Sequence, residues 1–351
     1  MENKYILITG GAGFIGSNLI ISLLRRFSNI HIISIDSMAT NNPIQLKEWR
    51  LKCIEDEVKN HPESTYTFIK GNIADVETVQ NLFNKYNFSI VVNLAAQAGV
   101  RYSINHPDTC MASNIIGFYN IIEACRKSGN TKHLVYASSS SVYGGSTKVP
   151  FSVDDNVDTP VSLYAATKKS NELIAHSYSK LYNIPCTGLR FFTVYGPGGR
   201  TDMAYYSFTE KLVRGDKIDV FNYGDCQRDF TYIDDIVEGI IRVMGSAPEK
   251  KTGEDGLPIP PYALYNIGGG NPENLMDFVH ILADELIRAK VLDNDFDIDK
   301  HVNLLPMQAG DVPVTYADAS GLERDFGFKP TIDLRTGLRK FAEWYSDYNR
   351  K

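Results

Sequence analysis

The sequence predicts an α/β fold: a doubly wound parallel sheet in the first part of the chain, followed by a smaller, mixed α/β C-terminal domain. Two observations support this prediction. Apolar runs of strand length alternate with helical stretches up to about residue 190, and a glycine-rich turn joins the first run to the first helix. Apolar strands separated by helices are typical of a parallel sheet covered on both faces, and right-handed crossovers make it doubly wound.

The predicted strands are the apolar runs YILIT (5–9), IHIISID (30–36), YTFIKGNI (66–73), IVVNLAA (90–96), KHLVYASSS (132–140) and IPCTGLRFF (184–192). The helical stretches between them lie at about 14–27, 44–60, 75–86, 108–128 and 162–182. Each helix is long enough to connect one strand to the next in a parallel sheet.

The alternation weakens after residue 190. There, YGPGGRTDMA and EKKTGEDGLPIPPY are rich in glycine and proline and predict loops. We therefore predict one domain over 1–191 and a second mainly over 192–351. Segments near 222–248, and ALYNIGG (263–269), are expected to return to the sheet of the first domain.

The composition is that of an ordinary globular protein, with 43% hydrophobic and 22% charged residues in 351. A net charge of −6 gives no reason to expect binding to nucleic acid or to an anionic membrane. The apolar stretch from Tyr5 to Leu24 is broken by glycines and by polar Ser17 and Asn18. It therefore predicts strand, turn and helix rather than a membrane span.

The chain has five cysteines, an odd number without metal-ligand spacing. Its seven histidines form no HxxxH or HExxH pattern. We therefore expect reduced thiols, a cytoplasmic location and no metal site.

A nucleotide-binding turn is predicted at TGGAGFIG, which places Gly10, Gly13 and Gly16 between a strand and a helix. Glycine allows a tight turn and lets the backbone approach a pyrophosphate at the helix N-terminus. The second strand ends in Asp36, where a carboxylate can bind the adenosine ribose. Because Ser37 and the following methionine offer no cation for a 2′-phosphate, the pattern favours NAD over NADP. The alternative is an ordinary glycine turn followed by an exposed aspartate.

A second motif, LYAATKKSNE (163–172), places Tyr164 and Lys168 one turn apart on one helical face. A tyrosine hydroxyl holds its proton at neutral pH, and a nearby ammonium favours the phenolate. The pair can therefore act as a base. A surface tyrosine beside a solvated lysine has the same spacing, so the spacing alone leaves both interpretations open.

Together these motifs resemble the extended short-chain dehydrogenase/reductase family, which places nucleotide-sugar epimerases, dehydratases and decarboxylases on a Rossmann scaffold. The resemblance covers nearly the whole chain. It rests on TGGAGFIG, NLAAQAGVRYS (93–103), YASSSSVYG (136–144), YAATK (164–168), RDFTYIDDI (228–236) and AGDVPVTYAD (309–318).

Within that family the chain is most similar to UDP-glucuronate 4-epimerases, through NLAAQAGVRYS, SSSSVYG and LRFFTVYGPGGRTDMA (189–204). Galactose-type epimerases carry asparagine where this chain has Thr193, and they lack the run ending in Arg200. Two departures stand out. Asn72 replaces the usual aspartate of the third strand, and residues 36–50 follow the family pattern only loosely.

The resemblance implies inversion at C4 of a UDP-sugar, most closely UDP-glucuronate to UDP-galacturonate, through a transient 4-keto intermediate and with NAD as cofactor. Tyr164 is then the base, Lys168 binds the nicotinamide ribose, and Ser139 contacts the C4 oxygen. A serine that merely caps a turn is the alternative for Ser139. The implied cofactor-binding residues are Gly10, Gly13, Phe14, Ile15, Gly16, Asp36, Asn72, Ile73, Leu94, Ala95, Ala96, Tyr164 and Lys168.

A 4-keto glucuronate readily loses carbon dioxide, so the enzyme must restrain the carboxylate. The residues implied for substrate binding are Ser139, Ser140, Ser141, Thr193, Arg200, Arg228 and Asp311. Among them, Arg228 is expected at the pyrophosphate and Asp311 at the uridine ribose. An ion pair of Arg228 with Asp225 or Asp229 is the alternative.

Other functions remain open. A UDP-glucuronate decarboxylase shares the first chemical step, and another UDP-hexose is a possible epimerase substrate. A 4,6-dehydratase is disfavoured because Ser140 and Ser141 occupy the places of its acidic pair, and a non-catalytic NAD sensor is remote. The resemblance also implies a homodimer built from 108–128 and 162–182. Apolar positions that could serve either the core or that interface are Ile115, Ile122, Leu173 and Ile174.

Overall fold

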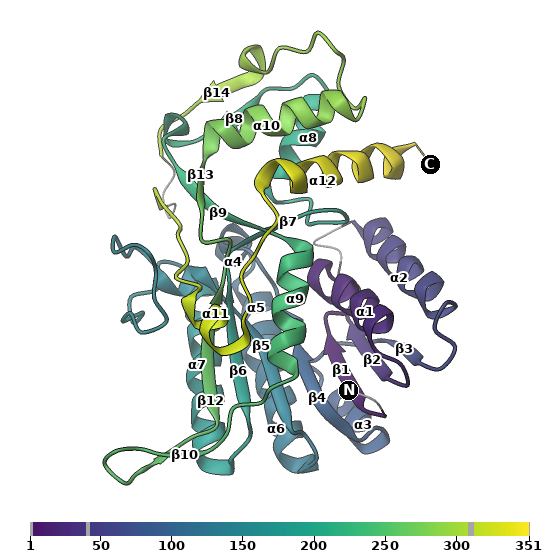
Figure 1. Cartoon of the computed structure of the whole chain (residues 1–351), viewed down its shortest axis with the longest axis vertical. Coiled ribbons are helices and arrows are strands. Elements are labelled where there is room, and N and C mark those ends of the chain that lie inside the picture. Colours follow the sequence, from purple (N-terminus) through teal and green to yellow (C-terminus); the bar gives the residue numbers. More distant parts are fainter. Residues whose placement is uncertain (1–2, 40–42, 308–311, 351) are drawn as a thin grey trace. The chain divides into compact units, whose positions relative to one another are not determined.

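A mostly parallel sheet forms the centre of the first of two compact units (Figure 1). The computed structural model describes residues 3–39, 43–307 and 312–350. The first unit comprises Met1–Ser146, Val153–Phe191 and Val237–Asn266. The second comprises Thr147–Ser152, Phe192–Ile236 and Ile267–Lys351.

The sheet of the first unit has seven strands in the order β12-β6-β5-β4-β1-β2-β3. They are β1 (Tyr5–Thr9), β2 (His31–Asp36), β3 (Thr65–Lys70), β4 (Phe88–Asn93), β5 (His133–Ser139), β6 (Cys186–Phe191) and β12 (Tyr262–Ile267). The pairings from β3 through β6 are parallel. The predicted fold class and the six predicted strands are confirmed. The order in which the chain adds strands reverses between β1 and β4, and doubly wound folds bind ligands beyond the carboxyl ends of the strands at such a point.

Helices connect the strands, as predicted. They are α1 (Phe14–Arg26), α2 (Ile44–Val58), α3 (Val76–Lys85), α4 (Val100–Asn105), α5 (Pro107–Met111), the π-turn η1 (Ala112–Ile116), α6 (Gly117–Ser128), the 3₁₀ turn η2 (Ser140–Tyr143) and α7 (Leu163–Tyr182). The predicted helix at 108–128 is therefore α5, η1 and α6 in succession. Apolar side chains such as Leu7, Val91 and Phe118 fill the core between sheet and helices.

The second unit contains two small sheets. One has the order β13-β9-β7, from β7 (Thr193–Tyr195), β9 (Gln227–Tyr232) and β13 (Pro272–Asn274), and the other pairs β8 (Ile218–Val220) with β14 (Val302–Leu304). Its helices are α8 (Ala204–Val213), α10 (Leu275–Arg288), α11 (Ser320–Phe326) and α12 (Leu334–Asn349).

The segment expected to return to the first domain is corrected in its bounds. Within 222–248, β9 remains in the second unit because it pairs with β7 and β13. The chain returns to the first unit inside α9 (Ile233–Met244), at Val237, and stays in it through β12.

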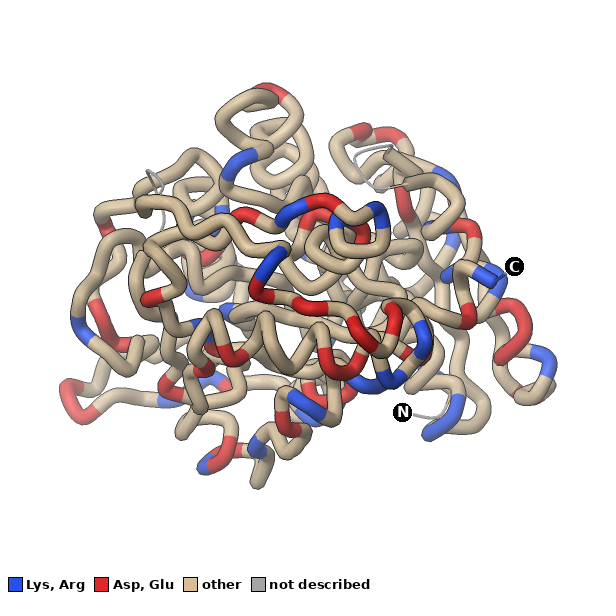
Figure 2. Tube along the Cα trace, turned by 90° about the horizontal axis from the view of Figure 1, so that it is seen from above, with Lys and Arg blue, Asp and Glu red and all other residues tan. Residues whose placement is uncertain are grey.

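Along the Cα trace, basic and acidic residues lie interspersed in the view from above (Figure 2). In the part of the chain that the structure describes, no helix is long and apolar enough to cross a membrane.

Candidate active site

The glycine turn after β1 is sterically closed to larger residues. Gly10 has φ +74°, and a Cβ atom there would lie 2.9 Å from the backbone nitrogen of Ala95. A Cβ atom on Gly16 would lie 2.3 Å from the Gly10 carbonyl oxygen. Helix α1 begins after Gly13 without a side-chain cap and without an acidic residue in its first turn. The first N–H groups of α1 therefore suit a pyrophosphate.

Asp36 ends β2 and is only 7% exposed, so the alternative of an exposed aspartate is wrong. Its Oδ2 accepts a hydrogen bond from the Ala12 N–H at 3.2 Å, and its Oδ1 accepts from the Met38 N–H at 2.8 Å. Lys47 Nζ, on α2, also lies 3.1 Å from Oδ1. Ser37 and Met38 supply no cation, as the sequence shows, but α2 brings the ammonium of Lys47 to the end of β2.

The other expected cofactor residues lie at the same edge of the sheet. The Ala95 N–H donates to Thr9 Oγ1 at 3.0 Å, which ties the segment after β4 to the end of β1. Asn72 Oδ1 accepts from the Ala74 N–H at 2.9 Å and so caps a turn after β3. Ile73 is buried, as is Phe14, whereas Ile15 is half-buried.

Tyr164 and Lys168 lie on the first two turns of α7. Ser162 caps this helix by accepting the Ala165 N–H at 3.1 Å, so Tyr164 is its second residue. Lys168 Nζ lies 5.9 Å from the centre of the Tyr164 ring and donates to the Ala137 carbonyl of β5 at 2.9 Å. Burial lowers the pKa of Lys168 to about 8. The ammonium and the positive end of α7 both favour a phenolate at this place.

The serine run spans the end of β5 and the start of η2. Ser139 Oγ accepts the Ser141 N–H at 3.2 Å and lies 3.2 Å from Ser141 Oγ. The capping role that was the alternative for Ser139 is therefore present. Ser140 and Ser141 are half-buried in η2.

The remaining expected substrate residues belong to the second unit. Thr193 opens β7 opposite Phe230. Arg200 forms an ion pair with Asp202, with Nε at 3.0 Å from Oδ1. Arg228 donates from Nη1 to the carbonyls of Gln227 at 2.9 Å and Pro313 at 3.0 Å. Asp311 lies outside the described residues.

Among the described residues, Arg228 forms no ion pair with Asp225 or Asp229, which was the alternative to a pyrophosphate contact. Asp229 is fully buried and accepts backbone N–H groups from Gly269 at 2.6 Å, Gly270 at 3.1 Å and Ala317 at 2.9 Å. Burial raises the pKa of Asp229 to about 6, although these three donors oppose the rise. Asp229 therefore joins three segments of the second unit.

Sequence reasoning missed a buried polar network on the helix that carries Tyr164 and Lys168. Glu172 pairs with Arg190 of β6 at 2.8 and 2.9 Å and accepts the Ser138 hydroxyl at 2.6 Å. Arg190 also donates to Tyr143 Oη at 3.0 Å, which donates to Asn266 Oδ1 at 2.6 Å. Two signals were available: Glu172 repeats the four-residue spacing of Tyr164 and Lys168, and Arg190 is the only charge in its apolar strand.

A second missed residue is Asn114, which lies in η1. Its Oδ1 accepts the Gln97 N–H at 2.8 Å, and its Nδ2 donates to Thr167 Oγ1 at 3.0 Å. Asn114 therefore links the segment after β4 to the catalytic helix α7.

Comparison with known proteins defines the family. A profile described as GDP-mannose 4,6 dehydratase, an extended short-chain dehydrogenase/reductase family, matches residues 7–341. The chain belongs to this family. The resemblance drawn from the motifs is confirmed.

Several relatives in this family are similar over their full length or most of it. The chain is 47% identical over 352 residues to Protein CapI of Staphylococcus aureus, covering 99% of each. It is 44% identical over 350 residues to UDP-glucuronate 4-epimerase 4 of Arabidopsis thaliana, covering 98% of this chain and 75% of the plant protein. Its fold matches that of UDP-glucuronic acid 4-epimerase from Bacillus cereus, solved with UDP-glucuronic acid and NAD. That match has a TM-score of 0.82 at 28% identity and covers 98% and 99% of the two chains.

Proposed function

We propose that the chain is an NAD-dependent 4-epimerase of a UDP-sugar, and that it interconverts UDP-glucuronate and UDP-galacturonate. The observation that carries the proposal is the pair on α7: Tyr164 on the first turn and Lys168, buried, on the second. The sugar is supported by the 44% identity to a UDP-glucuronate 4-epimerase over nearly the whole chain.

NAD fits the described residues. The uncapped N-terminus of α1 suits the pyrophosphate, and Asp36 lies at the end of β2, where the adenosine ribose is expected. Lys168, which already donates to Ala137, would hold the nicotinamide ribose. Bound NAD would supply the acceptor, and then the donor, of the hydrogen at C4.

The chain's own residues handle the proton. Tyr164, as phenolate, removes the proton of the C4 hydroxyl and returns it after the 4-keto sugar has presented its other face. Lys168 keeps the phenolate accessible at neutral pH, because its pKa of about 8 leaves it mostly protonated there. Ser139 holds the C4 oxygen by turning its hydroxyl from Ser141 towards the substrate.

We assign the remainder of the substrate to the polar residues that the family resemblance implies. The sugar carboxylate is restrained by Ser140, Ser141 and Thr193. Arg200 adds a positive charge near this carboxylate when its guanidinium leaves Asp202 and pairs with the substrate. Arg228 binds the pyrophosphate, because a guanidinium pairs well with phosphate oxygens. Asp311 is assigned to the uridine ribose.

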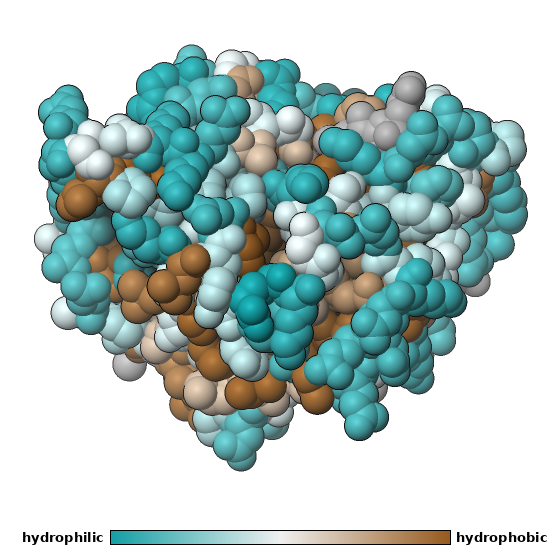
Figure 3. All heavy atoms as spheres, turned by 90° about the horizontal axis from the view of Figure 1, so that it is seen from below, coloured by the Kyte–Doolittle hydropathy of each residue, from teal (hydrophilic) through white to brown (hydrophobic). Residues whose placement is uncertain are grey.

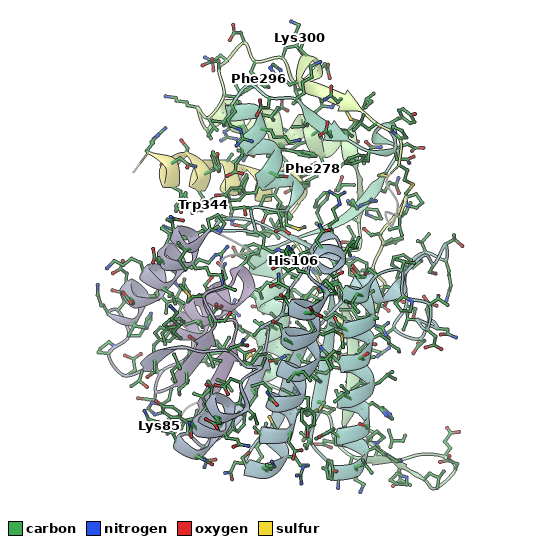
Figure 4. All side chains as sticks on the ribbon, turned by 180° about the vertical axis from the view of Figure 1, so that it is seen from behind. Lys85, His106, Phe278, Phe296, Lys300 and Trp344 are labelled. Carbon is green, nitrogen blue, oxygen red and sulfur yellow. The ribbon has the colours of Figure 1, made fainter. Side chains whose placement is uncertain are left out.

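A homodimer is part of the proposal. Helices α6 and α7 lie side by side on one face of the sheet (Figures 1 and 4). Ile122 is fully buried and serves the core, whereas Leu173 is 60% exposed. Figure 3 shows a face on which hydrophobic side chains reach the surface between hydrophilic ones. The cytoplasm is the proposed location, since all five cysteines are free thiols.

The test is product analysis by NMR after incubation with UDP-glucuronate and NAD. We expect UDP-galacturonate from the wild type and none from Tyr164→Phe, which loses only the proton acceptor and should still bind NAD. Tyr182→Phe, at the exposed end of the same helix, is the matched control. A UDP-pentose with released carbon dioxide would identify a decarboxylase instead, and substantial turnover by Tyr164→Phe would exclude Tyr164 as the base.

A further inference from the structure

Three charged side chains form a buried cluster, here called the Asp36 cluster, where β2 meets α2. Its members are Asp36, Lys47 and Arg50, which are 7%, 7% and 3% exposed. Lys47 Nζ lies 3.1 Å from Asp36 Oδ1. Lys47 and Arg50 are three residues apart on α2 and so share one face of that helix.

The Asp36 cluster also holds the glycine turn. Asp36 Oδ2 accepts the Ala12 N–H at 3.2 Å, and Arg50 Nη1 donates to the Ala12 carbonyl at 3.1 Å. The Asp36 cluster therefore binds both the backbone N–H and the backbone carbonyl of Ala12. The charged groups of Lys47 and Arg50 therefore lie close to both the glycine turn and the Asp36 carboxylate. This is the region assigned to the adenosine end of the cofactor.

The balance of charge in the cluster differs from that of a lone carboxylate. An aspartate at the end of β2 binds ribose hydroxyls and repels a 2′-phosphate. Here one carboxylate is accompanied by one ammonium and one guanidinium, and both of these groups attract phosphate. Lys47 lies within hydrogen-bond distance of the same Asp36 oxygen that accepts the Met38 N–H.

We propose that Lys47, with Arg50 beside it, offsets the charge of Asp36 and is the residue that sets the affinity ratio of NADP to NAD. The inference rests on the proposed NAD site, but it concerns cofactor binding and not turnover. Without Lys47, Asp36 excludes the 2′-phosphate strongly; with Lys47, the site tolerates it.

The first test is titration of cofactor-free protein with NAD and with NADP by calorimetry. Lys47→Met keeps the length of the side chain and removes its charge. We expect this variant to raise the ratio Kd(NADP)/Kd(NAD) by about fivefold or more, which corresponds to about 1 kcal/mol. Lys47→Arg should stay within about twofold of wild type, as should Lys52→Met, a 61% exposed position on the same helix. An unchanged or lower ratio in Lys47→Met overturns the inference.

The second test needs no variant and so does not depend on the folding of one. Raising the salt concentration screens whichever charge dominates at the 2′-phosphate. Asp36, Lys47 and Arg50 together carry a net charge of +1, so the inference expects the wild-type ratio Kd(NADP)/Kd(NAD) to rise with salt. A ratio that falls with salt would mean that the charge of Asp36 is not offset, which overturns the inference. Failure to bind either nucleotide would instead overturn the proposed NAD-dependent function, and the inference with it.

Discussion

At the scale of single residues, Lys168 shows how burial and function are linked. Its ammonium is 3% exposed, and its described hydrogen bond goes to a neutral acceptor, the Ala137 carbonyl. Burying a charge without an opposite charge is costly, which is why burial lowers the pKa of Lys168 from 10.5 to about 8. The catalytic lysine is therefore expected to lower the stability of the protein at neutral pH.

Lys168→Met should reveal the cost of burying the ammonium, because stability should then depend on pH differently in the variant and in the wild type. Between pH 8 and 10.5 the unfolded chain binds more protons at Lys168 than the folded chain does, so wild-type stability rises with pH in that window. The methionine variant lacks this rise. Denaturant unfolding of both proteins without cofactor, from pH 7 to 10, should show wild type gaining about 1–3 kcal/mol relative to the variant. Parallel curves would mean that Lys168 titrates normally.

Thr193 and Ser141 allow a test of carboxylate restraint. Thr193→Ala, alone or with Ser141→Ala, should leave oxidation at C4 possible but let the carboxylate rotate until carbon dioxide can leave. Losing one hydrogen bond of about 0.5–1.5 kcal/mol suffices for a several-fold shift from UDP-galacturonate towards a UDP-pentose. Both products and carbon dioxide are measured in wild type and variants. Slower turnover with an unchanged product ratio would mean that these hydroxyls bind the sugar without protecting it.

The proximity of the two proposed catalytic residues was predictable because it is local. Tyr164 and Lys168 are four residues apart on one helix, so their neighbourhood follows from helical periodicity. Lys47 and Asp36 are also close in sequence, yet a loop and the start of α2 decide whether they meet. The sequence spacing of Asp36 and Lys47 therefore did not predict their contact, which only the folded structure shows.

At the scale of secondary-structure elements, the Glu172–Arg190 pair ties α7 to β6. Both side chains are at most 2% exposed, and the pair is bidentate. Glu172 also accepts the hydroxyl of Ser138, the residue before Ser139. The network therefore fixes the end of β5 against the helix that carries Tyr164.

Arg190→Met should destabilise the protein by about 3–5 kcal/mol, because it leaves the Glu172 carboxylate buried without its main partner. The double variant Arg190→Met/Glu172→Met should recover part of this loss. Thermal or denaturant unfolding measures both. Arg214→Met breaks the exposed pair with Asp216 and serves as the control, with an expected cost of about 0–1 kcal/mol. A cost for Arg190→Met as small as that of the control would show that the network adds little to stability.

Strands β1 to β6 were predictable because buried parallel strands are continuous apolar runs. The small strands of the second unit were not, since β7, β8, β13 and β14 have three residues each and no periodicity to detect. Strand β9 lies in the segment 222–248, which was expected to return to the large sheet, but pairing with β7 and β13 keeps it in the second unit.

At the scale of the whole molecule, association is the property to test. The exposed apolar residues of the first unit include Met111, Ile116, Tyr119 and Leu173, at 43%, 48%, 45% and 60%. They lie on α5, η1, α6 and α7, which are neighbours in the fold. Exposed apolar residues on neighbouring helices are typical of an interface between subunits.

Leu173→Glu should convert the dimer to a monomer at micromolar concentration, because it places a charge in the proposed interface. Light scattering should give twice the chain mass of 39.3 kDa for wild type and the single mass for the variant. Val213→Glu, at a position 47% exposed on α8, is the matched control and should remain dimeric. A wild-type protein that is already monomeric would refute the proposed dimer.

The interleaving of the two units along the chain has a consequence for synthesis. A ribosome releases its product from the N-terminus at about 5–20 residues per second. Strand β6 is complete at Phe191, but its neighbour β12 emerges only with Tyr262–Ile267, after the segment Phe192–Ile236 of the second unit has been made. Until then β6 presents an open, apolar edge to other nascent chains. A pause in translation between these two strands is therefore the moment at which this protein is most prone to aggregate.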